Sequence, residues 1–438
     1  MRITRPAKTV RVTVQMKKII THIPEHLSIN QLGPGLITGA ADDDPSGIAT
    51  YSQAGAQFGF NMLWTVIFTF PLMAGIQMIS ARIGWVTGRG LAANIREQFP
   101  VQVLYGIVGL LLLANTINIA ADIAAMAEAL RLLVGGPAHV YAVTFGLLSL
   151  VLLIFLRYET YVRYLKWLTL ALLSYVAVIF TIDVPWTAVA AKSLWPTLSW
   201  NNATITMIVA VFGTTISPYL FFWQAAQEME DKRAGQMGNE PVDDPAVTKS
   251  HLRRIRRDTI IGMGFSNLVA FFIILSTAAT LNLAGVTNIQ TSAQAAEALR
   301  PLAGDFTFLL FSLGIIGTGM LAVPVLAGSA AYAVAEAFDW RTGLDLSPYE
   351  GRRFYGIVAI ATLGGVVLCF TPIDPMKELF WSAVINGVIA VPIMVVMMLL
   401  ASRKKVMGQH AIRRRLTILG WSATAVMAMA VIAMFVTM

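Results

Sequence analysis

The chain has 438 residues, of which 56% are hydrophobic and 13% are charged, with a mean hydropathy of +0.68 and a formal net charge of +8. These values exclude an ordinary soluble globular domain and indicate a membrane protein with many spans. The apolar runs lack the strict alternation of a transmembrane barrel, so we expect the spans to be helices. The single cysteine, Cys369, lies in an apolar run, which excludes a disulfide framework and a thiolate metal cluster.

The chain begins with a tail, residues 1–30, that carries basic residues but lacks the apolar core of a cleavable signal peptide. Apolar runs between charged residues then predict eleven transmembrane helices. Residues 31–184 hold helices 1 to 5, residues 203–402 hold helices 6 to 10, and residues 416–438 hold helix 11. The predicted spans are 34–58, 62–81, 102–130, 139–156, 164–182, 203–227, 259–283, 306–335, 354–373, 379–402 and 416–437.

The distribution of Lys and Arg supports this number of spans. With a cytoplasmic N-terminus, all but four of the 32 basic residues lie on the inner side. The outer four are Arg131, Lys192, Arg300 and Lys377. The positive charge therefore reflects orientation rather than nucleic-acid binding. We expect a multi-pass protein of the plasma or inner membrane, with its C-terminus on the extracytoplasmic side.

The longest inner loop, residues 228–257, contains an acidic stretch and the sequence "HLRRIRR", which starts at His251. A solvated loop that touches anionic lipid headgroups explains this cluster. A regulatory site is the alternative.

Two of the predicted helices are interrupted close to their midpoints. Helix 1 breaks at Asp42–Gly47 and helix 6 breaks at Gly213–Tyr219, and Pro45 and Pro218 are the residues that break them. Each of these helices opens a group of five, and because five is odd, the second group is inverted relative to the first. Inverted repeats whose first helices are unwound at mid-membrane are typical of secondary transporters, where the break lines a cavity.

The spans carry acidic residues, but no Lys or Arg lies at mid-membrane depth. The acidic residues are Asp42, Asp43 and Asp44 in helix 1 and Asp122 and Glu128 in helix 3. Each charged group inside a membrane costs roughly 3 kcal/mol on insertion scales, so these carboxylates are candidates for function. Since no basic side chain is at hand, the partner must be a proton or a bound cation.

Asp44 has two compatible interpretations. It can cap the outer half of helix 1, with Pro45 at the first helical position, and it can also bind a cation where backbone carbonyls converge. Asp42 and Asp43 are expected to face an aqueous inner vestibule as an attracting rim. The polar residues Asn115, Asn118 and Asp122 share one face of helix 3, where they either line the permeation path or bond neighbouring helices.

The groups available near the two breaks all offer oxygen. We expect the metal site to comprise the Asp44 carboxylate, backbone carbonyls around Gly47 and Thr214, the hydroxyls of Thr215 and Ser217, and the amide of Asn386. The five histidines lie in tails, loops or a helix end, so imidazole ligation at mid-membrane is not expected. Hard oxygen donors favour Mg²⁺, Ca²⁺ or Mn²⁺. The small residues leave room for an ion that keeps much of its hydration shell.

Three segments carry a resemblance to a known family. The sequences "LITGAADDDPSGIATYSQAGAQFG", "NTINIAADIAAMAEAL" and "GTTISPYLFFWQ" resemble those of the Nramp divalent-metal transporters, and the similarity extends over most of the chain. This resemblance implies the leucine-transporter fold with eleven or twelve helices.

The departures from the Nramp pattern concern the metal site. Typical Nramp proteins have Asp-Pro-Gly-Asn in helix 1 and Met-Pro-His in helix 6, where this chain has Asp44-Pro45-Ser46-Gly47 and Ser217-Pro218-Tyr219. The glutamate three residues after the helix 3 aspartate is replaced by Ala125. The chain is similar in these respects to the Nramp-related magnesium transporters. That branch implies a wider site, transport of Mg²⁺ and also Mn²⁺, and no proton coupling.

We therefore expect an uptake transporter for Mg²⁺, and also Mn²⁺, that works by alternating access. Asp44 would be the principal ligand, with Asp42, Asp43, Asp122, Thr215 and Tyr219 along the pathway. We expect no resident cofactor, no nucleic acid and no obligate protein partner besides the lipid bilayer. The nearest alternative is a proton-coupled Mn²⁺ or Fe²⁺ transporter that uses Asp122. Further alternatives are a carrier of organic cations or amino acids and a channel. An enzyme is not expected, because the aspartates lack the motif of an intramembrane hydrolase and no His or Cys accompanies them.

Overall fold

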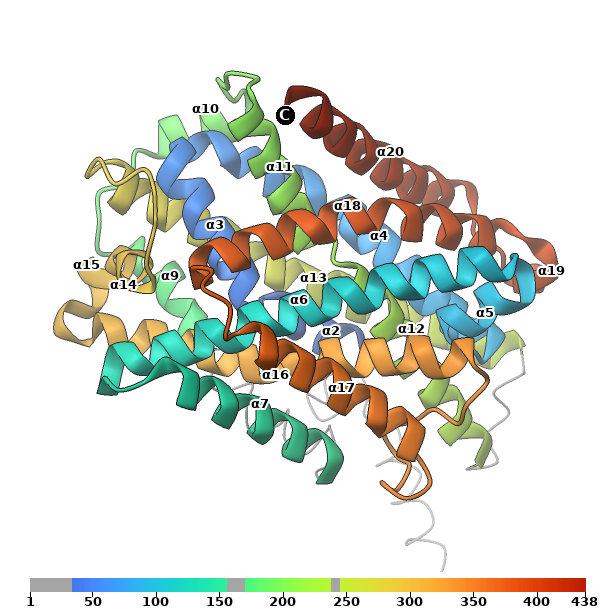
Figure 1. Ribbon diagram of the computed structural model, residues 1–438. Coiled ribbons are helices and arrows are strands. Elements are labelled where there is room, and N and C mark those ends of the chain that lie inside the picture. The colour runs from blue at the N-terminus through green and yellow to red at the C-terminus, as the bar shows by residue number, and fades with distance from the viewer. Residues whose placement is uncertain (1–33, 156–169, 238–244) are drawn as a thin grey trace, which may run out of the picture.

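The computed structural model describes residues 34–155, 170–237 and 245–438, and every regular element in these ranges is a helix (Figure 1). The whole predicted tail, residues 1–30, and residues 164–169 of the predicted span 164–182 lie outside the described residues. The helices of the first half are α2 (Pro34–Asp42), α3 (Pro45–Phe58), η1 (Gly59–Met62), α4 (Leu63–Thr87), α5 (Leu91–Gln98), α6 (Val101–Val134), α7 (Ala138–Phe155), η2 (Leu170–Leu172), α9 (Leu173–Val178) and α10 (Trp186–Leu194).

The remaining helices continue to the end of the chain. They are α11 (Asn202–Thr215), α12 (Pro218–Met237), α13 (Pro245–Thr277), the π-helix η3 (Ala278–Asn282), α14 (Ser292–Ala296), η4 (Glu297–Leu299), α15 (Arg300–Ala303), η5 (Gly304–Phe306), α16 (Thr307–Ala337), α17 (Arg352–Leu368), α18 (Pro375–Ser402), α19 (Lys404–Met407), η6 (Gly408–His410) and α20 (Arg414–Thr437).

Eight helical stretches in the described ranges are long and apolar enough to cross a membrane. They include the continuous runs Pro45–Thr87 and Ser292–Ala337, which join several of the elements above. The predicted boundaries agree with the observed helices to within a few residues at most spans. The count of eleven spans and the inverted arrangement of the two groups stay predictions, because α17 and residues 164–182 are not among these eight stretches.

The predicted inner loop 228–257 is mostly helix. α12 continues to Met237 and α13 already begins at Pro245, so the two flanks of the predicted loop are helical rather than irregular. Helix formers and charged residues sustain both extensions, and an interhelical ion pair connects them: Arg254 on α13 contacts Glu228 on α12 at 2.8 Å.

Both predicted interruptions are present. The first separates α2 from α3 at Asp43 and Asp44, and the second separates α11 from α12 at Ile216 and Ser217. A proline follows each break, and because proline lacks a backbone N–H and clashes with the preceding turn, it favours the end of the helix before it and suits the first position of the next one. The two breaks lie side by side, since the Tyr219 hydroxyl at the start of α12 donates to the Ala41 carbonyl at the end of α2 (3.1 Å).

Close backbone contact between small residues fixes α2 against α13. A Cβ atom added at Gly39 would lie 2.6 Å from the Cα atom of Gly262, and one added at Gly35 would lie 2.7 Å from the backbone nitrogen of Thr259. Glycines of this kind let membrane helices approach closely, where van der Waals contact replaces the missing hydrophobic drive. The inner half of the broken helix 1 is therefore held mainly by α13.

This packing predicts opposite effects for two Gly→Ala substitutions. Gly39→Ala is expected to destabilise the protein by about 1–3 kcal/mol, because the new methyl group overpacks the contact with α13. Gly106→Ala in α6 is the control, since nothing lies within 4 Å of the position that its new methyl group would take, and it should leave stability unchanged or raise it by about 0.5–1 kcal/mol. Thermal unfolding of both variants in the same detergent measures the difference. Equal melting temperatures for the two variants would contradict the close packing of α2.

Candidate cation-binding site between the interrupted helices

Asp44 lies at the first break and bonds to both interrupted helices. One carboxylate oxygen, Oδ1, accepts from the backbone N–H of Gly47 (2.7 Å) and from the Ser46 hydroxyl (2.7 Å). The other, Oδ2, accepts from the Tyr219 hydroxyl of α12 (3.3 Å). The side chain is only 2% exposed. The predicted capping of α3 is thus confirmed, and the second oxygen at the same time faces the other break.

Of the hydroxyls near the second break, two are hydrogen-bonded within the protein and one is not. Ser217 donates its hydroxyl to the carbonyls at the end of α11, at 2.7 Å from Thr214 and 3.1 Å from Gly213. Thr215 bonds to the carbonyl of Val211 (2.6 Å) in its own helix. The Thr214 hydroxyl has no hydrogen-bond partner among the described residues. It lies 3.1 Å from where a Cβ atom of Gly47 would be. Thr214 is therefore the hydroxyl that the fold leaves available beside Asp44.

Asn386 of α18 lies beside the second break. Its helix contacts α11 so closely that a Cβ atom at Gly213 would lie 2.5 Å from the backbone nitrogen of Gly387. The amide oxygen of Asn386 accepts from the Asn118 amide of α6 (2.9 Å), while its own amide nitrogen has no partner in the described ranges. Asn386 is positioned by α6, with its remaining hydrogen-bonding group unused.

The polar face of α6 serves two roles. Asn115 bonds to α16, through the carbonyl of Leu326 (2.9 Å) and the Ser329 hydroxyl (2.7 Å), so this residue joins helices. Asp122 is fully buried, and neither of its carboxylate oxygens has a hydrogen-bond partner within the described part of the chain. It interacts electrostatically with Asp44. Asn115 therefore bonds neighbouring helices, whereas a place for Asp122 on the permeation path stays a prediction.

Asp42 and Asp43 do not form a solvent-facing rim, and that expectation is wrong. They are 1% and 3% exposed, and both contact the hydroxyl of Ser266 on α13, at 2.5 Å and 3.0 Å. The two residues are buried because α2 packs tightly against α13, which places the end of this half-helix inside the protein. A hydroxyl has one hydrogen to donate, so it cannot satisfy two carboxylates at once.

The site offers oxygen ligands without a preformed cluster of acids. In the described ranges, no ion pair involves the four buried aspartates, and no group of three or more His, Cys, Asp or Glu side chains is placed to hold a metal ion. A cation at Asp44 would therefore complete its coordination with hydroxyl oxygens, carbonyl oxygens and water. Mg²⁺ is bound in this way, through one or two carboxylates and several retained waters.

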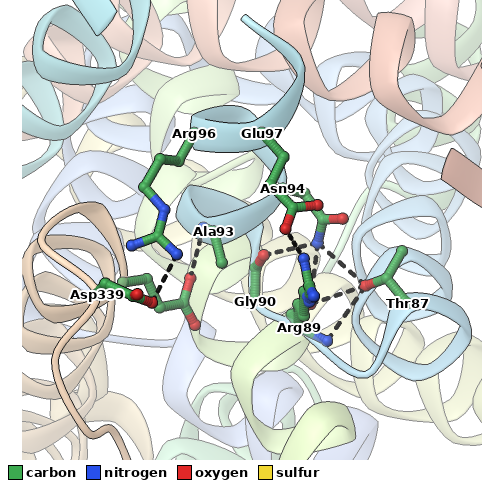
Figure 2. A network of polar contacts seen from close by, with 9 residues as sticks. Thr87, Arg89, Gly90, Ala93, Asn94, Arg96, Glu97 and Asp339 are labelled. Atoms are coloured by element: carbon green, nitrogen blue, oxygen red, sulfur yellow. Dashed lines mark hydrogen bonds and ion pairs between the residues drawn. The ribbon is translucent and has the colours of Figure 1, made fainter.

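A second polar region closes the end of the bundle that carries α5 and was not predicted (Figure 2). The Glu336 carboxylate, in the last turn of α16, accepts from the backbone N–H of Ala93 at the start of α5 (3.2 Å), and a side chain at Gly90 would overlap it. Arg96 of α5 donates to Asp339 just beyond α16 (2.6 Å). These contacts border a cavity of about 350 Å³. Sequence reasoning missed Glu336 because it lies one residue beyond the predicted span 306–335.

An acidic side chain, Glu230, also joins α12 to α16. The Tyr332 hydroxyl of α16 donates to Glu230 of α12 (2.5 Å), and the same carboxylate accepts from the backbone N–H of Leu344 (3.1 Å). The rings of Trp223 and Tyr332 pack edge to face, with centroids 6.2 Å apart. The second half of the broken helix 6, α12, is thereby held against α16 by residues that follow its first turn.

Comparison with protein families decides the classification. A family model described as natural resistance-associated macrophage protein-like, Nramp, matches residues 35–437. The chain belongs to the Nramp family. Among curated Nramp relatives, the divalent metal cation transporter MntH of Deinococcus radiodurans is 28% identical and covers 89% of this chain and 86% of that protein. MntH of Burkholderia ambifaria is 27% identical and covers 90% and 86%.

Solved structures agree with an Nramp fold. The manganese transporter of Eremococcus coleocola, in complex with an aromatic bis-isothiourea compound, has a TM-score of 0.69 at 18% identity and covers 92% of this chain and 85% of that one. MhsT in complex with L-phenylalanine has a TM-score of 0.60 at 12% identity, covering 93% and 98%. Mhp1, a nucleobase-cation-symport-1 family transporter, has a TM-score of 0.55 at 15% identity, covering 93% and 93%. The fold is the one shared by Nramp and leucine-transporter-fold proteins.

The contact between α2 and α13 predicts a specific role for one serine of this Nramp chain. Ser266→Ala removes the donor that faces Asp42 and Asp43, and we expect it to destabilise the protein by about 1–3 kcal/mol, because buried carboxylates lose their partner. Ser276→Ala on the same helix is the control, since that hydroxyl bonds only to a carbonyl of its own helix. Thermal unfolding in detergent compares them. The assignment fails if the two variants melt at the same temperature.

Proposed function

We propose that this chain transports divalent metal cations across the membrane by alternating access, with Mg²⁺ as the main substrate and Mn²⁺ as a further one, without co-transport of protons. The observation that carries the proposal is the Asp44 carboxylate, which is buried between two interrupted helices near the Thr214 hydroxyl, an oxygen without a hydrogen-bond partner among the described residues. Curated relatives named divalent metal cation transporters support the substrate class.

The preference for Mg²⁺ is supported by what the site lacks. Ser217 and Tyr219 stand where the family pattern that this chain resembles has methionine and histidine, so the residues at the second break provide no soft sulfur or imidazole ligand. Oxygen-only sites favour hard cations, and a site with one strong carboxylate suits an ion that retains water. Gly47, Thr214 and Asn386 would supply the remaining protein contacts, directly or through that water.

The membrane potential is a sufficient driving force without a co-substrate. Moving one elementary charge across 100 mV is worth about 2.3 kcal/mol, so a divalent cation gains roughly 4.6 kcal/mol. Since a tenfold concentration ratio corresponds to about 1.4 kcal/mol, this supports an accumulation of about three decades.

The orientation that fits uptake places the N-terminus in the cytoplasm. The helices that contain Lys192 and Arg300, α10 and α15, are both in the left half of Figure 1, whereas α5 and α19 are at its right. The end with α5 and α19 holds the more basic connections, such as 403–405 and 413–415. By the positive-inside rule, this end faces the cytoplasm.

Substitution of the proposed ligand tests the site. We expect wild-type protein to bind Mg²⁺ in isothermal titration calorimetry and Asp44→Ala to lose this binding, because the substitution removes the carboxylate that accepts a hydrogen bond from Tyr219 of α12 at the breaks. Asp305→Ala is the control, since it removes an exposed carboxylate far along the chain in η5. Unchanged Mg²⁺ affinity in Asp44→Ala would refute the ligand assignment.

One observation favours a second candidate function, a proton-coupled Mn²⁺ or Fe²⁺ transporter. Asp122 is a buried carboxylate without a hydrogen-bond partner among the described residues, and it interacts with Asp44. A group in this position can accept a proton in exchange for a metal ion. Against this role, Ala125 stands where the family pattern has the glutamate of the proton route.

Transport with an internal pH indicator separates these two functions. In proteoliposomes under an inside-negative potential, we expect Mg²⁺ uptake that follows the potential and leaves the internal pH unchanged, because no proton accompanies the ion. Asp122→Asn should then retain uptake. Acidification that rises in proportion to metal entry, and that disappears in Asp122→Asn, would establish proton coupling instead.

A further inference from the structure

The first half of α13 presents a strongly basic face that the proposed transport does not use. Lys249, Arg253, Arg256 and Arg257 are all exposed, and none forms a hydrogen bond or ion pair within the described part of the chain. Arg254, in the same run, is different. It donates to Glu228 (2.8 Å) and to Asp231 (2.9 Å) on α12. The sequence "HLRRIRR" thus combines one structural arginine with three that point outward.

An apolar stripe continues the same face of α13. Ile260, Ile261, Phe265 and Leu268 are 36%, 58%, 44% and 50% exposed. Residues three and four apart share one face of a helix, so the exposed positions from Lys249 to Leu268 form one continuous surface. The apolar part of this surface belongs to a membrane-spanning stretch, Ala246–Asn282, and therefore faces lipid acyl chains. The basic part meets it within one helical turn, at the depth of the lipid headgroups.

The opposite face of α13 is occupied by the protein itself. Thr259 and Gly262 contact the backbone of α2, and Ser266 bonds to Asp42. The exposed face is consequently the only side of this part of α13 on which a ligand from the membrane has room among the described elements.

We propose that this surface is a binding site for one anionic phospholipid. The phosphate lies among Arg253, Arg256 and Arg257, and an acyl chain follows Ile261 and Phe265. Arginine suits a phosphate because its planar guanidinium donates two parallel hydrogen bonds. Asp258 lies next to Arg257 and interacts with it, which still leaves the face with an excess of positive charge. Clusters of basic residues beside a membrane span attract anionic lipids.

A lipid fits this surface better than a soluble polyanion does. Nucleic acid or an acidic protein would use the basic half and leave the apolar half uncovered, whereas a phospholipid matches both halves in the order in which they occur along the helix. The apolar positions from Ile260 to Leu268 rise by about 12 Å along the axis, at 1.5 Å per residue, which is long enough to contact much of one acyl chain.

Native mass spectrometry of the purified full-length chain tests the site. The wild type is expected to retain dioleoyl phosphatidylglycerol in preference to dioleoyl phosphatidylcholine. Each basic residue near an anionic lipid strengthens binding roughly fivefold. The variant Arg253→Gln/Arg256→Gln/Arg257→Gln should therefore bind phosphatidylglycerol about a hundredfold more weakly. Phosphatidylglycerol binding that is the same in the wild type and in this variant would overturn the proposal.

A matched variant distinguishes a site from general surface charge. Arg413, Arg414 and Arg415 are also exposed, but they are consecutive, so their side chains diverge around the start of α20. Arg413→Gln/Arg414→Gln/Arg415→Gln removes the same charge and should keep the bound phosphatidylglycerol. Equal losses in both triple variants would show non-specific attraction and would refute the site on α13.

The apolar half has a test of its own. Ile261→Ala/Phe265→Ala keeps the arginines and should weaken binding of dioleoyl phosphatidylglycerol several times more than binding of the short-chain dihexanoyl form. If the double variant binds both lipids as the wild type does, the acyl contact is refuted. These measurements read lipid binding without transport, so their outcome is independent of whether the chain carries Mg²⁺.

Discussion

A carboxylate buried between two half-helices, with no basic side chain bonded to it in the described part of the chain, is the constraint on which the rest of this structure depends. Asp44 is stabilised locally by the N–H of Gly47 and the hydroxyls of Ser46 and Tyr219. These donors reduce the cost of burial without neutralising the charge. The break before Pro45 supplies one of these donors, the N–H of Gly47, because the first N–H groups of a helix have no carbonyl partner within it. The proposed transport site and a helix cap are here the same residue.

The helix α13 connects this site to the membrane. On one face it holds the inner half of the broken helix 1, through the glycine contacts and through Ser266 beneath Asp42 and Asp43. On the other face it carries the basic and apolar surface proposed to bind a phospholipid. The proposed alternating access requires movement of elements next to the site, and α2 is one of these elements. The packing of α13 therefore sets how α2 is held, whichever ion is carried.

Much of the site could be predicted from residue types alone. The breaks at Pro45 and Pro218 and the capping role of Asp44 follow from local rules about proline and capping, and the proximity of the two breaks was expected from the transporter pattern that they suggest. Two kinds of feature could not be predicted in this way. The burial of Asp42 and Asp43 depends on Gly39 meeting Gly262, which are far apart in the sequence. The network around Glu336 depends on the short helix α5 approaching the end of α16, and nothing in either segment by itself signals that approach.

The sequence by itself determined that the chain crosses a membrane as helices, that two of them are interrupted, and that an acidic group lies at the first interruption, since hydropathy and proline act over short distances along the chain. Only the tertiary structure decided which polar groups form hydrogen bonds within the protein and which remain free to bind a ligand. Thr215 and Ser217 bond to carbonyls of α11, whereas Thr214 and Asp122 keep unused oxygen atoms beside Asp44. The physical reason is that a hydrogen bond or a close contact depends on distances of a few ångströms between helices, and the position of each helix is set by the packing of all the others.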